Sequence, residues 1–300
     1  MENNITQKMI MQMSDYNIDT IEHFDSSINC INNFNYVQQL YWQPNPYILN
    51  MLVNYCASHI FTNNSILEVG PGFYLFPLAK KNIRYNNNEN INENDIYLDI
   101  DENILPFTNK YIDFIYCRHT LEDLQNPKFA LKEMIRTSKH GYIETPSPLV
   151  ECIKGIDTNN FSHIYCGYLH HRYIIWTDME NNTIYFLPKY GMIENLANFH
   201  PLFKQKIIDI LNNYCIYWNT YFIWKDGEEE PNIVVYKNWI NIGLNNNLAF
   251  DYATLLEKAI RTSIKSTNYF IRNYSHLLNH DKNDNISDVF ELTLSSKPIC

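Results

Sequence analysis

The sequence predicts an α/β fold built on a doubly wound, mostly parallel sheet, and three observations lead to this prediction. Short apolar segments typical of buried strands alternate with segments of helical periodicity between about residues 66 and 146. A Gly-x-Gly pair directly follows the first of these strands, in a chain with only 8 glycines. No apolar run reaches the roughly 18 residues that would span a bilayer. We therefore expect a globular protein with βαβ units.

The elements of this region follow one another at short intervals. Strands are expected at 66–69, 81–85, 95–101, 111–117 and 142–146. Helical spacing of apolar residues marks the segments 47–60, 73–81 and 126–138. Gly141 stands at the usual place for a helix carboxyl end, so we expect it to close the third helix. A polar stretch from 82 to 94 is expected to form a surface loop around the second strand.

The rest of the chain breaks this rhythm. We expect an insertion rich in Cys, His and aromatic residues at about 149–190, and a helix at 193–213. A terminal antiparallel hairpin, 214–224 with 233–237, is expected to close the sheet, and a helix follows at about 251–278. The expected domains are a helical lead-in at 1–60, the α/β domain at 61–240 and a helical extension at 241–300.

Charge and cysteine usage narrow the function classes. The net charge is −10, so no overall positive field attracts nucleic acid. The seven cysteines show no paired spacing, and the amino terminus lacks the pattern of a secretory signal. We expect a protein of the reducing cytoplasm with neither nucleic acid nor membrane as its partner.

The segment Ile66–Gly72, ILEVGPG, carries the strongest functional signal. It predicts a buried strand that bears Glu68 and ends in two glycines, at the sheet edge where open α/β folds bind ligands. A pyrophosphate site would favour a third glycine where Leu75 stands, and Glu68 would repel the phosphates. A ligand with an ammonium and a sulfonium group would instead be attracted. S-adenosylmethionine is such a ligand.

At this point the chain resembles the class I S-adenosylmethionine-dependent methyltransferases, especially the type 11 subgroup, whose fold is Rossmann-like. Four ordered segments carry the resemblance: ILEVGPG, DIDENILPF, YIDFIYCRHTLEDLQNP and FALKEMIRTSKHGYIETP. The resemblance implies that the cofactor S-adenosylmethionine contacts residues of the first three segments. These residues are Glu68, Gly70, Pro71, Gly72, Asp101, Glu102, Arg118 and His119. The family's ribose-binding acid has no clear counterpart after the strand 81–85.

Two groups of residues are candidates for the acceptor side. His119 follows the fourth strand, where an imidazole can act as a base near neutral pH. The alternative is that a helix begins there, capped by Thr120, with Glu122 and Asp123 favouring its dipole. In the insertion, His170 and His171 are the other catalytic candidates, with aromatic packing under a lid as the alternative reading.

The insertion also raises a weaker metal hypothesis. Cys152, His163, Cys166 and His170 offer four zinc-type ligands, but their spacing is not a common one, so no metal is predicted. The sequence thus predicts a methyltransferase whose acceptor is unidentified, with a small molecule slightly favoured. Its rival is a catalytically inactive, methyltransferase-like binding module.

Overall fold

Packing divides the chain into two units that alternate along the sequence. The computed structural model describes residues 44–59, 65–72, 74–85, 93–154, 156, 165–190, 193, 207–211, 214–236 and 248–277. Among these, the large-sheet unit holds the residues within Asn35–Thr145, Tyr221–Pro231 and Phe270–Cys300. The small-sheet unit holds those within Pro146–Thr220 and Asn232–Tyr269. The predicted lead-in lies outside the described residues up to position 43, and the predicted domain boundaries stay a prediction.

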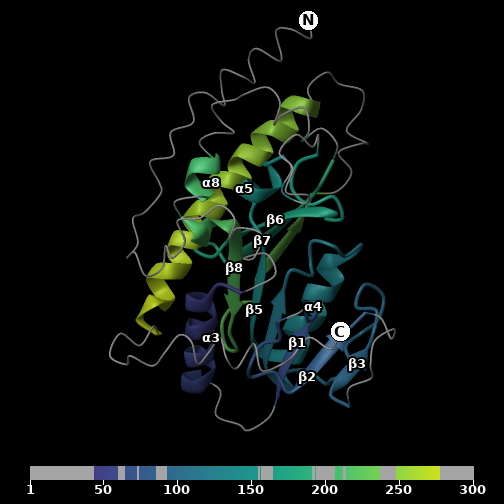
Figure 1. Ribbon diagram of the computed structural model, residues 1–300. Coiled ribbons are helices and arrows are strands. Elements are labelled where there is room, and N and C mark those ends of the chain that lie inside the picture. The colour runs from purple at the N-terminus through teal and green to yellow at the C-terminus, as the bar shows by residue number, and fades with distance from the viewer. Residues whose placement is uncertain are drawn as a thin grey trace, which may run out of the picture. The chain divides into compact units, whose positions relative to one another are not determined.

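The large-sheet unit is built on a six-stranded sheet, and its strands β1–β3 lie side by side in Figure 1. The strand order is β3-β2-β1-β4-β5-β8. The strands are β1 (Ile66–Val69), β2 (Lys81–Arg84), β3 (Asp95–Tyr97), β4 (Ile112–Arg118), β5 (Ser138–Pro146) and β8 (Asn219–Trp224). The pairs β1/β2, β2/β3, β1/β4 and β4/β5 are all parallel. This sheet confirms the predicted fold class.

The order of the strands reverses between β1 and β4. The chain runs from β1 outward to β3 and then returns to pair β4 on the other side of β1. Val69 faces Cys117 in that pairing, so the carboxyl ends of the two central strands lie next to each other. In open α/β sheets such a reversal is where ligands bind. Helix α4 (Pro127–Thr137) connects β4 to β5, and α3 (Pro46–His59) precedes β1.

Two local predictions in this unit are wrong. Residues 74–80 of the expected helix 73–81 are not helical and contain a turn at 77–78, and residue 73 lies outside the described residues. Pro77 lacks an N–H donor and clashes with a preceding helical turn, which explains the interruption. Gly141 lies inside β5 and does not close a helix, since α4 ends at Thr137. A Cβ on Gly141 would lie 1.9 Å from the Trp224 ring, so a glycine is needed there for close packing with β8.

Aromatic rings fill much of the core of the large-sheet unit. Phe76 stacks on Tyr116 with ring centroids 4.5 Å apart, and Tyr116 stacks on Tyr142 at 5.5 Å. Tyr142 in turn lies 6.5 Å from Tyr221 of β8. All four rings are buried. Their continuous packing fixes the strands from which the polar groups of the sheet edge project.

The small-sheet unit contains a three-stranded sheet of order β6-β7-β9. Its elements are α5 (Pro148–Glu151), β6 (Tyr173–Asp178), β7 (Thr183–Pro188), η2 (Cys215–Trp218) and β9 (Asn232–Val235). β6 and β7 are antiparallel, whereas β7 and β9 are parallel. The expected insertion at 149–190 therefore contains a strand pair. Of the helix expected at 193–213, residues 193 and 207–211 are helical, and the others lie outside the described residues.

Only the first strand of the hairpin that was expected to close the large sheet joins that sheet. β8 takes the edge position beside β5, as predicted for that strand. The second strand, β9, pairs with β7 instead, from Thr183↔Asn232 to Phe186↔Val235. β6 occupies one side of β7, and the backbone of β9, a strand rich in β-branched residues, pairs with the hydrogen-bonding groups on its other side.

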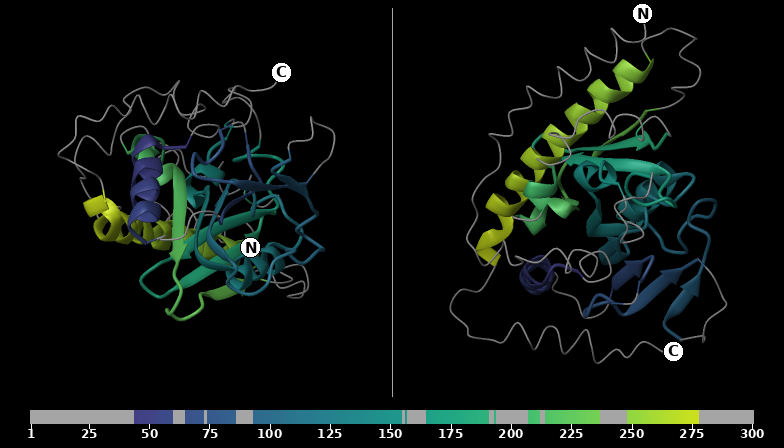
Figure 2. Two further views of the ribbon diagram at one scale, coloured as in Figure 1. Left: turned by 90° about the horizontal axis from the view of Figure 1, so that it is seen from below. Right: turned by 45° about the horizontal axis from the view of Figure 1, so that its top comes forward.

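Helix α8 (Leu248–Tyr274) confirms the predicted carboxyl-terminal helix, and Figure 2 shows it as one continuous element. The short η4 (Ser275–Leu277) follows it. The buried residues of α8 recur at helical spacing: Tyr252, Leu256, Ala259, Ile260, Ile264 and Phe270. No helix among the described residues is long and apolar enough to cross a membrane.

Candidate active site

The predicted cofactor residues after β1 form a turn at the carboxyl end of the large sheet. Gly70 has φ +68°, a conformation that glycine adopts without steric cost. A Cβ at Gly70 would lie 2.0 Å from Oγ1 of Thr120, so the segment after β4 packs directly over this glycine. A Cβ at Gly72 would meet no atom within 4 Å. Gly70 therefore serves packing within the protein, whereas Gly72, just beyond Pro71, leaves open space beside the turn.

Glu68 lies beneath this turn with 2% of its surface exposed. Its Oε2 accepts a hydrogen bond from the Phe76 N–H at 2.8 Å. Burial raises the pKa of Glu68 to about 8, although that hydrogen bond and the charges of Arg84 and Arg118 oppose the rise. Glu68 thus ties the residues after the glycine turn back to β1. Because it is largely protonated at neutral pH, it does not supply the negative charge that was expected to attract a cationic ligand.

Asp101 and Glu102 follow β3. The Asp101 carboxylate accepts hydrogen bonds from the backbone N–H groups of Gln125 at 3.0 Å and Asn126 at 2.7 Å. Asp101 therefore anchors the segment that leads into α4. Its carboxylate oxygens keep lone pairs for a further donor, because an ionised carboxylate offers about four acceptor positions. Glu102 is exposed.

The end of β2 is the place where the family's ribose-binding acid is expected. In this chain Arg84 ends the strand, and its Nε lies 2.7 Å from Oδ2 of Asp95 on β3. Tyr85 follows with 74% of its surface exposed. Asn82 also donates to Asp95, at 2.8 Å. The nearby acid, Asp95, therefore lies on the neighbouring strand and already accepts hydrogen bonds from two side chains.

Arg118 ends β4 and is paired with a buried carboxylate of β5. Its Nε lies 2.9 Å from Oε1 of Glu144, and the Tyr142 hydroxyl donates to Oε2 of the same carboxylate at 2.6 Å. Glu144 is 1% exposed. Sequence reasoning missed Glu144, whose only signal was its place at the carboxyl end of a predicted strand. The pair places a compensated charge at the edge of the sheet.

His119 follows Arg118 in an unusual backbone conformation. Its φ is +49°, which side chains with a Cβ rarely adopt. Its backbone N–H donates to the Glu144 carbonyl at 2.8 Å. The Nδ1 atom lies 3.3 Å from Oε1 of Glu122, and Nε2 lies 3.9 Å from Oε1 of Glu144. The imidazole, 8% exposed, therefore lies between two buried carboxylates.

The alternative reading of this segment, a helix amino terminus, is wrong. Residues 120–126 are not helical and contain a turn at 121–123, and the helix α4 begins only at Pro127. Thr120 instead lies over the glycine turn, with its Oγ1 3.4 Å from the carbonyl oxygens of Val69 and Gly70. Glu122 is 1% exposed, which no capping role accounts for. Glu122 is therefore a buried carboxylate beside the His119 ring and not a helix-capping residue.

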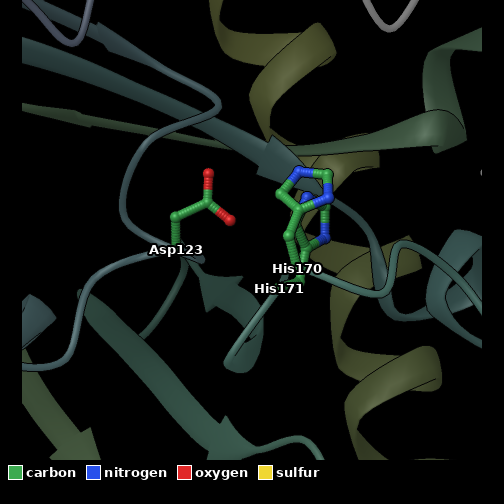
Figure 3. Close-up of side chains that lie close together, drawn as sticks. All are labelled: Asp123, His170 and His171. Carbon is green, nitrogen blue, oxygen red and sulfur yellow. The ribbon is translucent and has the colours of Figure 1, made fainter.

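The small-sheet unit holds the two other predicted histidines. Nδ1 of the buried His171 lies 2.6 Å from Oε1 of Glu151, and Oε2 of that carboxylate accepts from Lys189 Nζ at 2.6 Å. Lys189 and His171 lower the pKa of Glu151 to about 2, against the opposing effect of burial. His170 is exposed, and its ring lies edge-on to that of His171 at 4.6 Å. Figure 3 shows these two rings together.

Sequence reasoning missed Glu151 and Lys189. They are 38 positions apart, and no motif links them. A Cβ on Gly167, at φ +59°, would lie 2.2 Å from Oε2 of Glu151, so the loop before β6 closes over this carboxylate. The network of Lys189, Glu151 and His171 thus ties α5, this loop and the end of β7 together.

The zinc hypothesis gains no support from the described residues. His163 lies outside them. Cys152, Cys166 and His170 do not gather as a group of metal ligands within the part of the chain that the structure describes. Burial also raises the pKa of the Cys152 thiol well above its ordinary value, which disfavours the thiolate that zinc binds.

Comparison with known proteins gives a family match over the central sheet. Residues 68–143 match a family model described as a methyltransferase domain. This match confirms the resemblance over that segment, which runs from β1 to β5 and makes up about a quarter of the chain. A search of the curated proteins found no match.

Solved structures of methyltransferases are also similar to parts of the chain. An S-adenosylmethionine-dependent methyltransferase from Mesorhizobium loti is 16% identical over 29% of this chain and 48% of its own, with a TM-score of 0.25. One from Archaeoglobus fulgidus is 15% identical over 39% and 60%, with a TM-score of 0.28. One from Thermotoga maritima, described as a possible histamine N-methyltransferase, is 17% identical over 44% and 66%, with a TM-score of 0.26. The chain spans about half the length of the first structure.

Proposed function

We propose that this protein transfers a methyl group from S-adenosylmethionine to an acceptor. The observation that carries the proposal is the match of residues 68–143 to a methyltransferase domain. The same residues run from β1 through β4 into β5, where the strand order reverses. Their carboxyl ends bear the glycine turn, His119 and the Arg118–Glu144 pair. This is the part of an α/β sheet at which a ligand is expected.

The residues at this edge fit such a cofactor. The open space at Gly72 admits a ligand close to the backbone. The Asp101 carboxylate retains acceptor capacity for an amino group such as that of adenine. When bound, S-adenosylmethionine supplies an electrophilic methyl group on a sulfonium, and the protein's task is to position the acceptor and exclude water. Glu68, Pro71, Glu102 and Arg118 complete the proposed cofactor residues.

The acceptor side of the proposal rests on histidines. His119 is the proposed base for an acceptor that must lose a proton, because it lies at the carboxyl end of β4. His170 and His171 are proposed as further acceptor-side residues. A small molecule is the proposed acceptor class, and the net charge of −10 disfavours nucleic acid. The cytoplasm remains the proposed location.

Isothermal titration with S-adenosylmethionine tests the proposal. We expect the wild type to bind one equivalent and Gly72→Leu to lose most of the affinity, because the new side chain enters the open space beside the turn. Glu228→Gln is the matched control, since Glu228 lies in an exposed ion pair with Lys225. Thermal unfolding checks that both variants fold. A wild type that does not bind contradicts the proposal.

Activity needs a separate test. A panel of small molecules with hydroxyl, amine and thiol groups, incubated with methyl-labelled S-adenosylmethionine, reports the transfer of label. Labelled product supports the enzyme. Binding of the cofactor without transfer to the panel, to protein or to nucleic acid supports the rival function, an inactive methyltransferase-like binding module.

A further inference from the structure

The backbone of His119 is fixed in place from two sides. Its N–H donates to the Glu144 carbonyl of β5, and the next residue, Thr120, packs over Gly70. The φ of +49° is disfavoured for a residue with a Cβ, and no turn requirement explains a histidine there when glycine or asparagine would adopt it more easily. Unfavourable backbone conformations that persist are concentrated at functional sites. The side chain of His119 is therefore the feature to explain.

The two carboxylates beside His119 have different surroundings. Glu144 is neutralised by Arg118 at 2.9 Å and also accepts from Tyr142. Its Oε1 lies 3.9 Å from Nε2 of His119, which is too long for a hydrogen bond. Glu122 is 1% exposed, and its Oε1 lies 3.3 Å from Nδ1. The arrangement gives the Nδ1 side a nearby carboxylate and leaves Nε2 outside hydrogen-bonding distance of Glu144.

We propose that Glu122 is a positioning residue for His119. Resting on the proposed function, this inference holds that Glu122 accepts the Nδ1–H, which fixes the tautomer in which Nε2 bears the lone pair. As the acceptor heteroatom bonds to the methyl carbon, the carbon–sulfur bond breaks with its electron pair on sulfur. Nε2 receives the proton that the acceptor loses. Glu122 then faces the imidazolium and stabilises its charge.

The tautomer is measurable without any acceptor. Nitrogen-15 NMR of histidine-labelled protein distinguishes Nδ1–H from Nε2–H, and the spectrum of His119→Asn identifies the His119 signals among the 10 histidines. We expect the wild type to show the Nδ1–H form. In Glu122→Gln this preference weakens, because a neutral amide is a poorer acceptor than a carboxylate, and the pH at which the ring takes up its second proton falls, because a neighbouring negative charge has been removed. Glu144, whose Oε1 lies 3.9 Å from Nε2, and its ion-pair partner Arg118 are unchanged in this variant.

Matched variants separate positioning from folding. Glu228→Gln removes a carboxylate from an exposed ion pair of the same unit and should leave the His119 signals unchanged. Glu122→Asp keeps the charge and should restore the Nδ1–H form in part. Asparagine adopts the left-handed backbone conformation more easily than histidine, so we expect His119→Asn to be at least as stable as the wild type. With an acceptor from the panel, Glu122→Gln should lower kcat about 10- to 100-fold with cofactor affinity unchanged.

The inference is overturned if the wild type shows the Nε2–H form, or if Glu122→Gln leaves both the tautomer and the protonation midpoint unchanged. It is also overturned if kcat is unaffected in a Glu122→Gln variant that binds cofactor normally. Failure of the wild type to bind S-adenosylmethionine contradicts the proposed function instead. The NMR result still decides whether Glu122 orients His119.

Discussion

Glu68→Gln tests whether the buried acid beneath the glycine turn is protonated in the folded protein. Glutamine has nearly the same shape, cannot ionise, and its side-chain carbonyl can still accept the Phe76 N–H. The variant therefore removes the ionisation of Glu68 and keeps its hydrogen bond. Any change in stability that depends on pH then reports on the charge of this carboxyl group.

The magnitude follows from the pKa of Glu68, which burial raises from its ordinary value of 4.5 to about 8. A group whose pKa is raised by folding stabilises the fold fully below the unfolded value and loses this contribution as pH rises through the folded value. At about 1.4 kcal/mol for each pH unit, the loss is on the order of 3 kcal/mol at pH 7 and 5 kcal/mol above pH 8. Glu68→Gln has no such loss.

Urea unfolding of both proteins between pH 5 and pH 8.5 provides the measurement. The free energy of unfolding of the wild type should fall relative to Glu68→Gln across this range, and other titrating groups cancel in the difference. The exposed-site variant Glu228→Gln should show a flat difference from the wild type. A flat difference for Glu68→Gln, or one in which the wild type gains stability with rising pH, refutes this account of the buried acid.

Two further stability predictions concern packing and a buried charge. Gly70→Ala places a Cβ 2.0 Å from Thr120 Oγ1 at φ +68°, and we expect a loss of about 2 kcal/mol or more, whereas Gly72→Ala, with open space, should unfold like the wild type. Equal losses in the two variants would contradict this reading. Glu151→Gln leaves Lys189 without its buried carboxylate, so the free energy of unfolding at pH 7 should be about 3 to 5 kcal/mol lower than that of the wild type. Because the pKa of Glu151 is lowered to about 2, the wild type should lose this advantage as pH falls from about 4.5 to 2, and a constant difference over that range would show that Glu151 is not ionised in the fold.

Local patterns were sufficient to predict the strands of the large sheet. β1 is a short apolar segment stopped by Gly70, and both features follow from neighbouring residues alone. Gly141 has an equally local signal for a helix end, yet it lies in β5 because it must accommodate Trp224 of β8. That contact joins residues 83 positions apart, so no short window of sequence contains it. Tertiary packing here overrides a local preference.

The candidate site divides in the same way. Gly70, Gly72 and His119 stand next to predicted strand ends and were found from the sequence. Glu122 was read as a helix-start residue, because an acid before a periodic apolar segment has that local meaning. Its burial beside His119 depends on how the chain turns after β4, which the sequence pattern does not contain.

The central claim is that S-adenosylmethionine binds at the carboxyl edge of the large sheet, and amide hydrogen exchange with and without this ligand tests it most directly. We predict slower exchange for Gly70, Gly72 and His119 on addition of the ligand, with little change at the amides of exposed residues such as Glu228 in the turn after β8. No protection at the glycine turn, or protection confined to the small-sheet unit, would contradict the claim.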